Sequence, residues 1–326
     1  TLINRRLHCT FPTTSQVMTN CITVNNLEMQ FPGCDALRDV TLNVPTGSVF
    51  ALLGENGAGK TTLIRILMGF LNPTGGSCTV CQRDPAREAL EIRRRVGYVS
   101  DTPALYSWMQ VEEIGWFAAA FYDDAFLDRY RELTSRYDLP RARKIKQLSK
   151  GQRAKVALAL ALAHDPELLI LDEPTSGLDP LVRRAFLESM VERAANGKTV
   201  LLSSHQISEI ERVADRIAIL RTGRIQLVDS LATLKDHLSE ITVTLSDPLI
   251  AVPIPSAPAE LLYEQQEGRQ CRWLVRNCTA EQKDELATHP GISRIDARPA
   301  TLEDLFIACS KPSATTDGEL HTPTTA

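Results

Sequence analysis

The sequence predicts an α/β fold with a mainly parallel sheet covered by helices. Two observations support this prediction. A glycine-rich loop stands between an apolar run and a helical period at residues 48–68, and short apolar runs alternate with helical periods from residue 96 to residue 214. Strands that alternate with helices form parallel sheets with both faces covered. Such sheets place their ligands at the carboxyl ends of the strands.

The glycine-rich loop fits the pattern G-x-x-x-x-G-K-[ST] and consists of Gly54, Glu55, Asn56, Gly57, Ala58, Gly59, Lys60, Thr61 and Thr62. Its glycines let backbone N–H groups surround a phosphate chain, its lysine brings a positive charge to the β- and γ-phosphates, and the Thr61 hydroxyl suits Mg²⁺. The strand before it and the helix after it complete an anion site. The loop therefore predicts a nucleotide phosphate, and alone it fits a kinase, GTPase, helicase or transporter ATPase.

The composition is that of an ordinary globular protein, and it narrows the function classes. The net charge of −4 argues against a protein that holds nucleic acid by bulk positive charge. The eight cysteines are scattered, so a disulfide scaffold is not expected. Cys78 and Cys81 have C-x-x-C spacing without a second pair, which favours two small strand residues over a redox or metal site.

The two ends of the chain differ from the rest. Residues 1–18 read as a disordered leader without an apolar signal core, and residues 311–326 as a polar, disordered tail. No apolar stretch reaches the ~18 residues of a membrane-spanning helix. We therefore expect a soluble, cytoplasmic chain that reaches a membrane only through a partner.

Between the ends, the periodicity predicts an ordered series of elements. Strands are expected at 19–31, 37–44, 48–53, 77–81 and 96–100, the first of them antiparallel, with helices at 62–68 and 87–95. Helices at 111–122 and 125–137 follow, then a buried helix at 147–164, strand 168–171, helix 181–196, strand 199–204, helix 207–214 and a hairpin at 216–228. This is one domain, residues 19–238, with a helical subdomain at about 101–155.

The pattern changes after residue 238. Strands are expected at 241–245, 272–276 and 292–297, helices at 279–288 and 301–308, and a proline-rich loop at 252–258. These elements predict a small accessory α+β module, residues 239–310, in which no catalytic motif is found.

Two carboxylates end the strand at 168–171. Asp172 is suited to hold Mg²⁺, directly or through water, and Glu173 to orient and polarise the water that attacks a γ-phosphate. An Asp-Glu-Pro sequence after a strand can also be a surface turn, but here it accompanies a phosphate-binding loop. The pair is therefore a candidate for hydrolysis.

One further stretch separates the nucleotide-binding classes: Leu148, Ser149, Lys150, Gly151 and Gln152. Serine and glycine at a helix N-terminus provide a second anion site, although they also form an ordinary helix cap. Together with the upstream loop, the stretch resembles the signature motif of the ATP-binding subunits of ABC transporters. The resemblance covers roughly residues 21–236 and implies the phosphate-loop NTPase fold of an ABC ATPase.

The other motifs of that family match in chain order. Residues 54–61 resemble Walker A and residues 168–173 resemble Walker B, which implies that Glu173 is the catalytic base. Residues 176–179 resemble the D-loop, which ends at Asp179, and His205 resembles the switch histidine that contacts the γ-phosphate. Phe31 stands where the family has an aromatic ring on adenine, the alternative being a core phenylalanine at a strand end.

One position departs from the family pattern. The family has a glutamine after the strand at 96–100 that ligates Mg²⁺ and links the site to the permease, and Asp101 stands there instead. A carboxylate can still bind Mg²⁺ or its water, but it adds negative charge near the γ-phosphate. The implied magnesium ligands are therefore Thr61, Asp172 and Asp101.

The resemblance also implies partners. Two ATP-binding subunits, identical or homologous, meet head to tail, so that each ATP contacts the loop of one chain and Ser149 and Gly151 of the other. Closure and opening of this dimer drive a separate permease. Residues 98–122 are the expected docking face for that permease, which places the chain on the inner face of the cell membrane. The end of the module is similar to exporter ATPases, which favours export. No nucleic-acid partner is expected; a non-transport ABC ATPase acting on ribosomes or DNA, and a regulatory module without turnover, are the alternatives.

Overall fold

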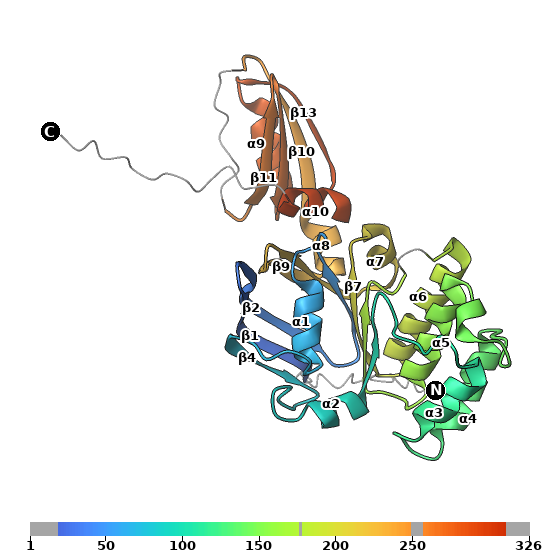
Figure 1. Ribbon diagram of the computed structural model, residues 1–326. Helices are drawn as coiled ribbons and strands as arrows, with labels where there is room; N and C mark the ends of the chain where they lie inside the picture. Colours follow the sequence, from blue (N-terminus) through green and yellow to red (C-terminus); the bar gives the residue numbers. More distant parts are fainter. Residues whose placement is uncertain (1–18, 176–177, 249–256, 311–326) are drawn as a thin grey trace, which may run out of the picture.

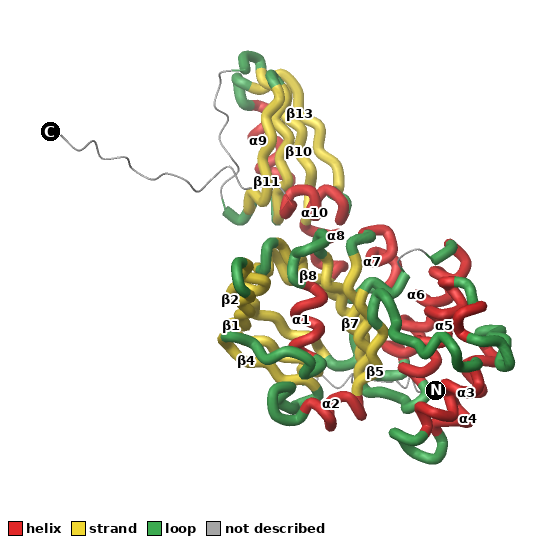
Figure 2. Tube along the Cα trace, viewed as in Figure 1, coloured by secondary structure: helices red, strands yellow, loops and turns green. Residues whose placement is uncertain are grey.

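The computed structural model describes residues 19–175, 178–248 and 257–310 (Figure 1). Within these ranges, an α/β body carries a smaller sheet beyond one end (Figure 2). The leader, the tail, loop residues 252–256, and Ser176 and Gly177 of the D-loop prediction lie outside the described residues. None of the described helices combines the length and apolarity needed to cross a membrane.

The central sheet confirms the predicted α/β class. Its strand order is β5 (Val96–Val99), β6 (Leu168–Asp172), β7 (Thr199–Ser204), β3 (Val49–Leu53), β8 (Arg216–Arg221) and β9 (Arg224–Ser230). Neighbouring strands are parallel except β9, which pairs antiparallel with β8. Every residue of β3, β6 and β7 is buried, which explains why these strands read as continuous apolar runs.

A second, antiparallel sheet lies beside the first and consists of β2 (Cys34–Pro45), β1 (Asn20–Phe31) and β4 (Gly75–Val80), in that order. Helix α1 (Lys60–Leu67) joins the two sheets, because its Ile64 shares one hydrophobic cluster with Val24 of β1 and Leu168 of β6. Helix α2 (Ala89–Arg95) leads into β5. The phosphate loop is thus supported by packing on both sides.

Helices α5 (Lys150–Leu162), α6 (Pro180–Ala195) and α7 (Ile207–Val213) contribute to the core on the other face of the central sheet. The predicted helical insert is present as α3 (Val111–Ala119), α4 (Phe126–Arg136) and the turn η1 (Ile145–Gln147). It has a cluster of its own, into which α5 inserts Val156. The expected helix at 147–164 begins only at Lys150, because Ser149 caps it.

The last part of the chain forms an antiparallel sheet ordered β11 (Glu260–Glu267), β12 (Gln270–Arg276), β10 (Leu238–Leu245) and β13 (Ile292–Pro299). It follows α8 (Leu231–His237) and carries α9 (Ala280–Thr288) and α10 (Leu302–Ser310). Helix α10 packs against the α/β body: its Leu305 belongs to the same cluster as Ile210 of α7. The predicted module therefore shares part of its core with the body, and its boundary at residue 239 remains a prediction.

Candidate functional site

The glycine-rich loop connects β3 to α1 and requires glycine at a defined point. Gly59 has φ +111°, a conformation that L-residues rarely adopt. A Cβ atom there would also lie 2.6 Å from the carbonyl oxygen of Ala36 and 2.9 Å from Leu37. The loop is therefore packed against the antiparallel sheet, and its close approach explains the glycine.

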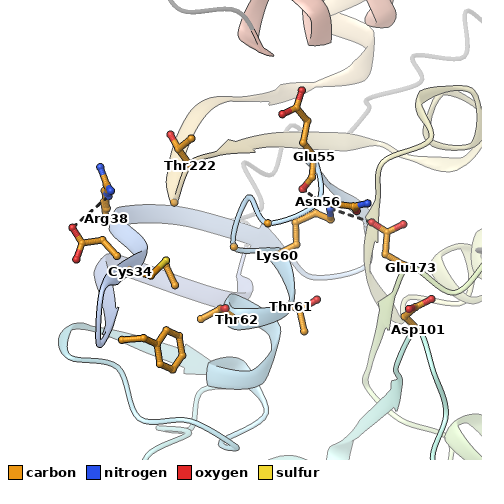
Figure 3. Close-up of a pocket in the computed structure, with 16 residues that line it drawn as sticks. Cys34, Arg38, Glu55, Asn56, Lys60, Thr61, Thr62, Asp101, Glu173 and Thr222 are labelled. Carbon is orange, nitrogen blue, oxygen red and sulfur yellow. Dashed lines mark hydrogen bonds and ion pairs between the residues drawn. The ribbon is translucent and has the colours of Figure 1, made fainter.

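Lys60 lies at the centre of the site, although its side chain is only 5% exposed. Its Nζ donates to the carbonyl oxygens of Gly54 at 2.7 Å and of Glu55 at 3.1 Å. The same ammonium group forms an ion pair with Oε1 of Glu173 at 3.1 Å (Figure 3). Two segments far apart in the sequence thus meet at one buried positive charge.

Thr61 and Asp172 form the part of the site that suits Mg²⁺. The Thr61 hydroxyl donates to Oδ2 of Asp172 at 2.8 Å, and the Ser203 hydroxyl donates to Oδ1 at 2.6 Å. Burial and the nearby Asp172 carboxylate raise the pKa of Tyr98. In the part of the chain that the structure describes, no three metal-ligating side chains cluster. The Thr61 hydroxyl and the Asp172 carboxylate are oxygen donors, and Mg²⁺ commonly takes one or two carboxylates together with phosphate oxygens and water.

Glu173 connects the loop to His205. Its Oε2 lies 2.7 Å from Nδ1 of His205, and its backbone N–H donates to the hydroxyl of Ser203 at 3.1 Å. Glu173 also has φ +50°, a left-handed conformation that is uncommon outside glycine and is found at functional sites. The structure thus holds the carboxylate between a lysine and a histidine, where it can accept a proton from a water molecule.

Lys60, Thr61 and Glu173 line a cavity of about 600 Å³. Most predicted loop residues line it, together with Phe31, Asp101 and Glu173. Phe31 is 40% exposed, which fits a platform for a ring better than a core position. Figure 3 shows Cys34 and Arg38 on one side of Lys60 and Asp101 and Glu173 on the other.

Several lining residues were not predicted. Cys34, Asp35, Ala36 and Arg38 enter from β2, and Thr222 and Gly223 from the turn between β8 and β9. This turn is tied to the loop, because the N–H of Gly223 donates to the carbonyl of Ala58 at 3.0 Å. No local motif marks these positions, which only strand pairing brings to the cavity.

The signature segment lies elsewhere. None of residues 148–152 lines the cavity at Lys60, and Lys150 lines a separate cavity of about 360 Å³ that also contains Asp101. Ser149 caps α5: its hydroxyl accepts from the N–H of Gln152, whose side chain accepts from the N–H of Ser149, both at 3.1 Å. A Cβ atom at Gly151 would lie 3.8 Å from the Asp179 carboxylate, so these two predicted residues are close together.

Glu209 of α7 is a further residue that sequence reasoning missed. It is 3% exposed, accepts a hydrogen bond from the Thr175 hydroxyl at 2.5 Å, and pairs with Nε of Arg183 at 3.1 Å. Thr175 follows Glu173 by two residues, and α7 begins two residues after His205. The buried carboxylate therefore ties together the segments that carry both. A glutamate in a short amphipathic helix gives no sequence signal for this role.

Comparison with known proteins agrees with this geometry. Residues 37–176 match a family model described as ABC transporter. The chain is 40% identical over 203 residues to an uncharacterized ABC transporter ATP-binding protein of Nostoc sp., which covers 60% of each protein. It is 34% identical over 224 residues to a fluoroquinolones export ATP-binding protein of Mycobacterium tuberculosis, which covers 68% of this chain and 74% of that protein.

A solved structure of the ATP-binding subunit of an ABC transporter aligns with a TM-score of 0.62 and 32% identity, over 66% of this chain and 92% of that one. The chain covers 60% of the length of the Nostoc sp. relative and 57% of the length of a second uncharacterized ABC transporter ATP-binding protein, from Synechocystis sp.. Motifs, fold and relatives together show that this chain belongs to the ABC transporter ATP-binding family, a family of ATPases with the phosphate-loop NTPase fold.

Proposed function

We propose that the chain binds ATP with Mg²⁺ and hydrolyses it as one half of a head-to-tail dimer that powers a separate membrane permease. One observation supports the dimer: the cavity at Lys60 is lined by the loop and Glu173 but by no residue of the segment 148–152. The helix N-terminus with Ser149 and Gly151 suits an anion such as a phosphate, and it lies outside the cavity in which Lys60 of the same chain would hold one. A second chain, turned head to tail, would bring that anion.

Within each site, the residues have distinct roles in this proposal. Lys60 and the loop N–H groups hold the phosphates, and Phe31 offers its exposed ring to the adenine. Thr61 and Asp172, with Asp101, would hold Mg²⁺, which neutralises charge on the phosphate oxygens when bound. Glu173, held by His205 and by the backbone contact to Ser203, would take the proton of the attacking water.

An aromatic surface on the helical insert supports the permease partner. Tyr106, Trp108, Trp116, Phe117 and Phe121 are all exposed large side chains, and Trp116 is 70% exposed. Tyr106 and Phe117 lie 5.6 Å apart between ring centroids, as do Phe117 and Phe121. Contiguous exposed apolar side chains of this kind mark protein contacts. We propose this surface, which lies within the 98–122 segment, as the permease contact on the inner face of the cell membrane.

Export is the proposed direction, because a relative that is 34% identical carries the name of a fluoroquinolones export ATP-binding protein. A role on ribosomes or DNA is less favoured, because the relatives are named as transporter subunits and the net charge is −4. Glu173 and His205, placed together beside Lys60, support turnover over a purely regulatory role.

The shared site can be tested by mixing two inactive variants. Lys60→Ala removes the loop lysine, and Gly151→Asp places a negative charge at the opposing anion site. In the mixed dimer, one site combines both defects and the other contains neither. We expect each variant alone to be inactive and an equimolar mixture to recover about a quarter of wild-type ATP turnover, because about half of the dimers are mixed and each has one intact site.

The matched control is Gly151→Ala, whose Cβ would lie 3.6 Å from Val182, an ordinary contact distance. This variant is expected to stay folded and active, which separates the added charge from simple bulk. A mixture as inactive as its two components, with both components folded, would contradict the head-to-tail site.

Asp101 provides a separate prediction. Asp101→Gln removes a negative charge from the cavity that receives the γ-phosphate and keeps an oxygen that can face Mg²⁺ or its water. We expect ATP turnover to be retained or raised up to about threefold, with a lower KM for ATP at limiting Mg²⁺. Steady-state turnover against Mg²⁺ concentration measures this, with Asp128→Asn on the exposed face of α4 as the control. Complete loss of turnover would show that the carboxylate itself is required.

A further inference from the structure

The sulfur of Cys21, in β1, faces the sulfur of Cys81, the residue directly after β4, at the end of the antiparallel sheet. The Sγ atoms of Cys21 and Cys81 lie 3.8 Å apart, although the residues are 60 positions apart in the chain. The N–H of Cys81 donates to the carbonyl of Cys21 at 2.8 Å, and the next pair along, Ile22 and Val80, is in antiparallel register. Cys81 follows this register by one residue with φ +48°, and the backbone hydrogen bond together with the short distance between the Sγ atoms places the two side chains within reach of a disulfide.

The pair is covered but can be reached from outside. Cys21 and Cys81 are 8% and 7% exposed, and both line a polar cavity of about 410 Å³ together with Arg95, Glu167 and Lys198. This cavity shares no lining residue with the one at Lys60. The cavity therefore gives a small polar reagent a route to the two cysteines that does not pass through the nucleotide site.

We infer that Cys21 and Cys81 form a reversible disulfide site that a low-molecular-weight disulfide, such as glutathione disulfide, oxidises through this cavity. The bridge would close a covalent loop that contains β1, β2, β3, the phosphate-binding loop and α1. Oxidation of the pair would therefore restrain the half of the body on which the nucleotide site is built.

The two thiols have unequal character. The hydrogen bond from Cys81 lowers the pKa of Cys21, against an opposing effect of burial, and the same bond raises the pKa of Cys81. Cys78, the other half of the C-x-x-C spacing, has its pKa raised to about 11 by burial. Since the thiolate is the attacking species, Cys21 is the entry point and Cys81 the resolving residue.

The chemistry balances with one equivalent of oxidant. The Cys21 thiolate attacks one sulfur of glutathione disulfide, forms a mixed disulfide and releases one glutathione thiolate, which takes up a proton. Cys81 then loses its proton and attacks the Cys21 sulfur, which releases the second glutathione. The two protein thiols together lose two electrons and form one disulfide, and one glutathione disulfide gains them and becomes two glutathione molecules.

The test oxidises the full chain with glutathione disulfide, blocks remaining thiols under denaturing conditions, and maps linked peptides by mass spectrometry. Trypsin leaves Cys78 on the peptide of Cys81, and both Cys9 and Cys34 on that of Cys21, so single variants assign the bond. We expect Cys9→Ser, Cys34→Ser and Cys78→Ser to keep the linked peptide, and Cys21→Ser and Cys81→Ser to lose it. The oxidised wild type is expected to melt about 5 °C higher than the reduced form, and dithiothreitol should reverse the shift.

Folding of each variant is checked by its melting temperature in reducing buffer, and Cys81→Ala serves as a second substitution if the serine variant does not fold. A link that requires Cys9, Cys34 or Cys78 would overturn the assignment. So would a folded protein that carries only glutathione adducts, or one that stays fully reduced in excess glutathione disulfide.

Discussion

Replacing Glu173 by glutamine is expected to lower ATP turnover by about 10³-fold while ATP still binds, because a general base contributes on the order of 10²–10⁴-fold. In the wild type, Nδ1 of His205 lies 2.7 Å from Oε2 of Glu173, and the glutamine amide can keep this contact. The amide cannot, however, take a proton from water. It also removes the negative partner of Lys60, which leaves that ammonium group to the phosphates. We therefore expect an ATP-bound dimer to accumulate.

Two measurements check this expectation: single-turnover hydrolysis of labelled ATP, and light scattering after gel filtration with and without ATP. Glu188→Gln is the matched control, because it removes an exposed carboxylate of α6 that pairs with Arg184 and does not line the cavity at Lys60. The control should behave as wild type. Turnover within tenfold of wild type in E173Q would rule out Glu173 as the base, and a variant that stays monomeric with ATP would count against the dimer.

The second large effect is expected at Lys60. Lys60→Ala should weaken ATP binding by about 100-fold, because charge-assisted hydrogen bonds to phosphate are worth roughly 1.5–3 kcal/mol and loop N–H groups alone remain. The substitution also removes the cation that pairs with Glu173, so the Glu173 carboxylate then repels the phosphates beside it. Binding of a fluorescent ATP analogue measures the change.

The control for this prediction is Lys235→Ala, which removes an exposed lysine of α8 with no place in the nucleotide cavity. Its affinity for ATP should match that of wild type. Near-UV circular dichroism of both variants separates lost contacts from lost folding. ATP affinity in K60A equal to that of the control would show that the cavity at Lys60 is not the nucleotide site.

Much of the fold was predictable because its signals are local. Strands β3, β6 and β7 are buried along their full length, so each contains a run of three to five consecutive apolar residues. Strand β11 was missed because its sequence, ELLYEQQE, is largely polar and lies at the edge of its sheet, where one side faces solvent. Helix α8 was missed because it follows β9 and leads into β10 with no intervening residues to mark its ends.

The site divides in the same way. Residues of the loop, Asp172 and Glu173 could be identified because consecutive residues at a strand end must share one place in space. Ser203, Glu209 and the turn at Thr222 could not, because their roles depend on contacts between strands or helices distant in the chain. The C-x-x-C spacing of Cys78 and Cys81 was interpreted as two small strand residues, and only the pairing of β1 with β4 brings Cys81, directly after β4, to Cys21.

By itself, then, the sequence determined the class of fold, the phosphate-binding loop and the chemical identity of the residues around it, since motif and hydrophobic period are properties of neighbouring residues. Only the tertiary structure decided that Lys60 pairs with Glu173, that Ser203 donates to Asp172, and that the turn at Thr222 lines the same cavity. These are contacts across long stretches of chain. They depend on how sheets and helices pack, which no local pattern encodes.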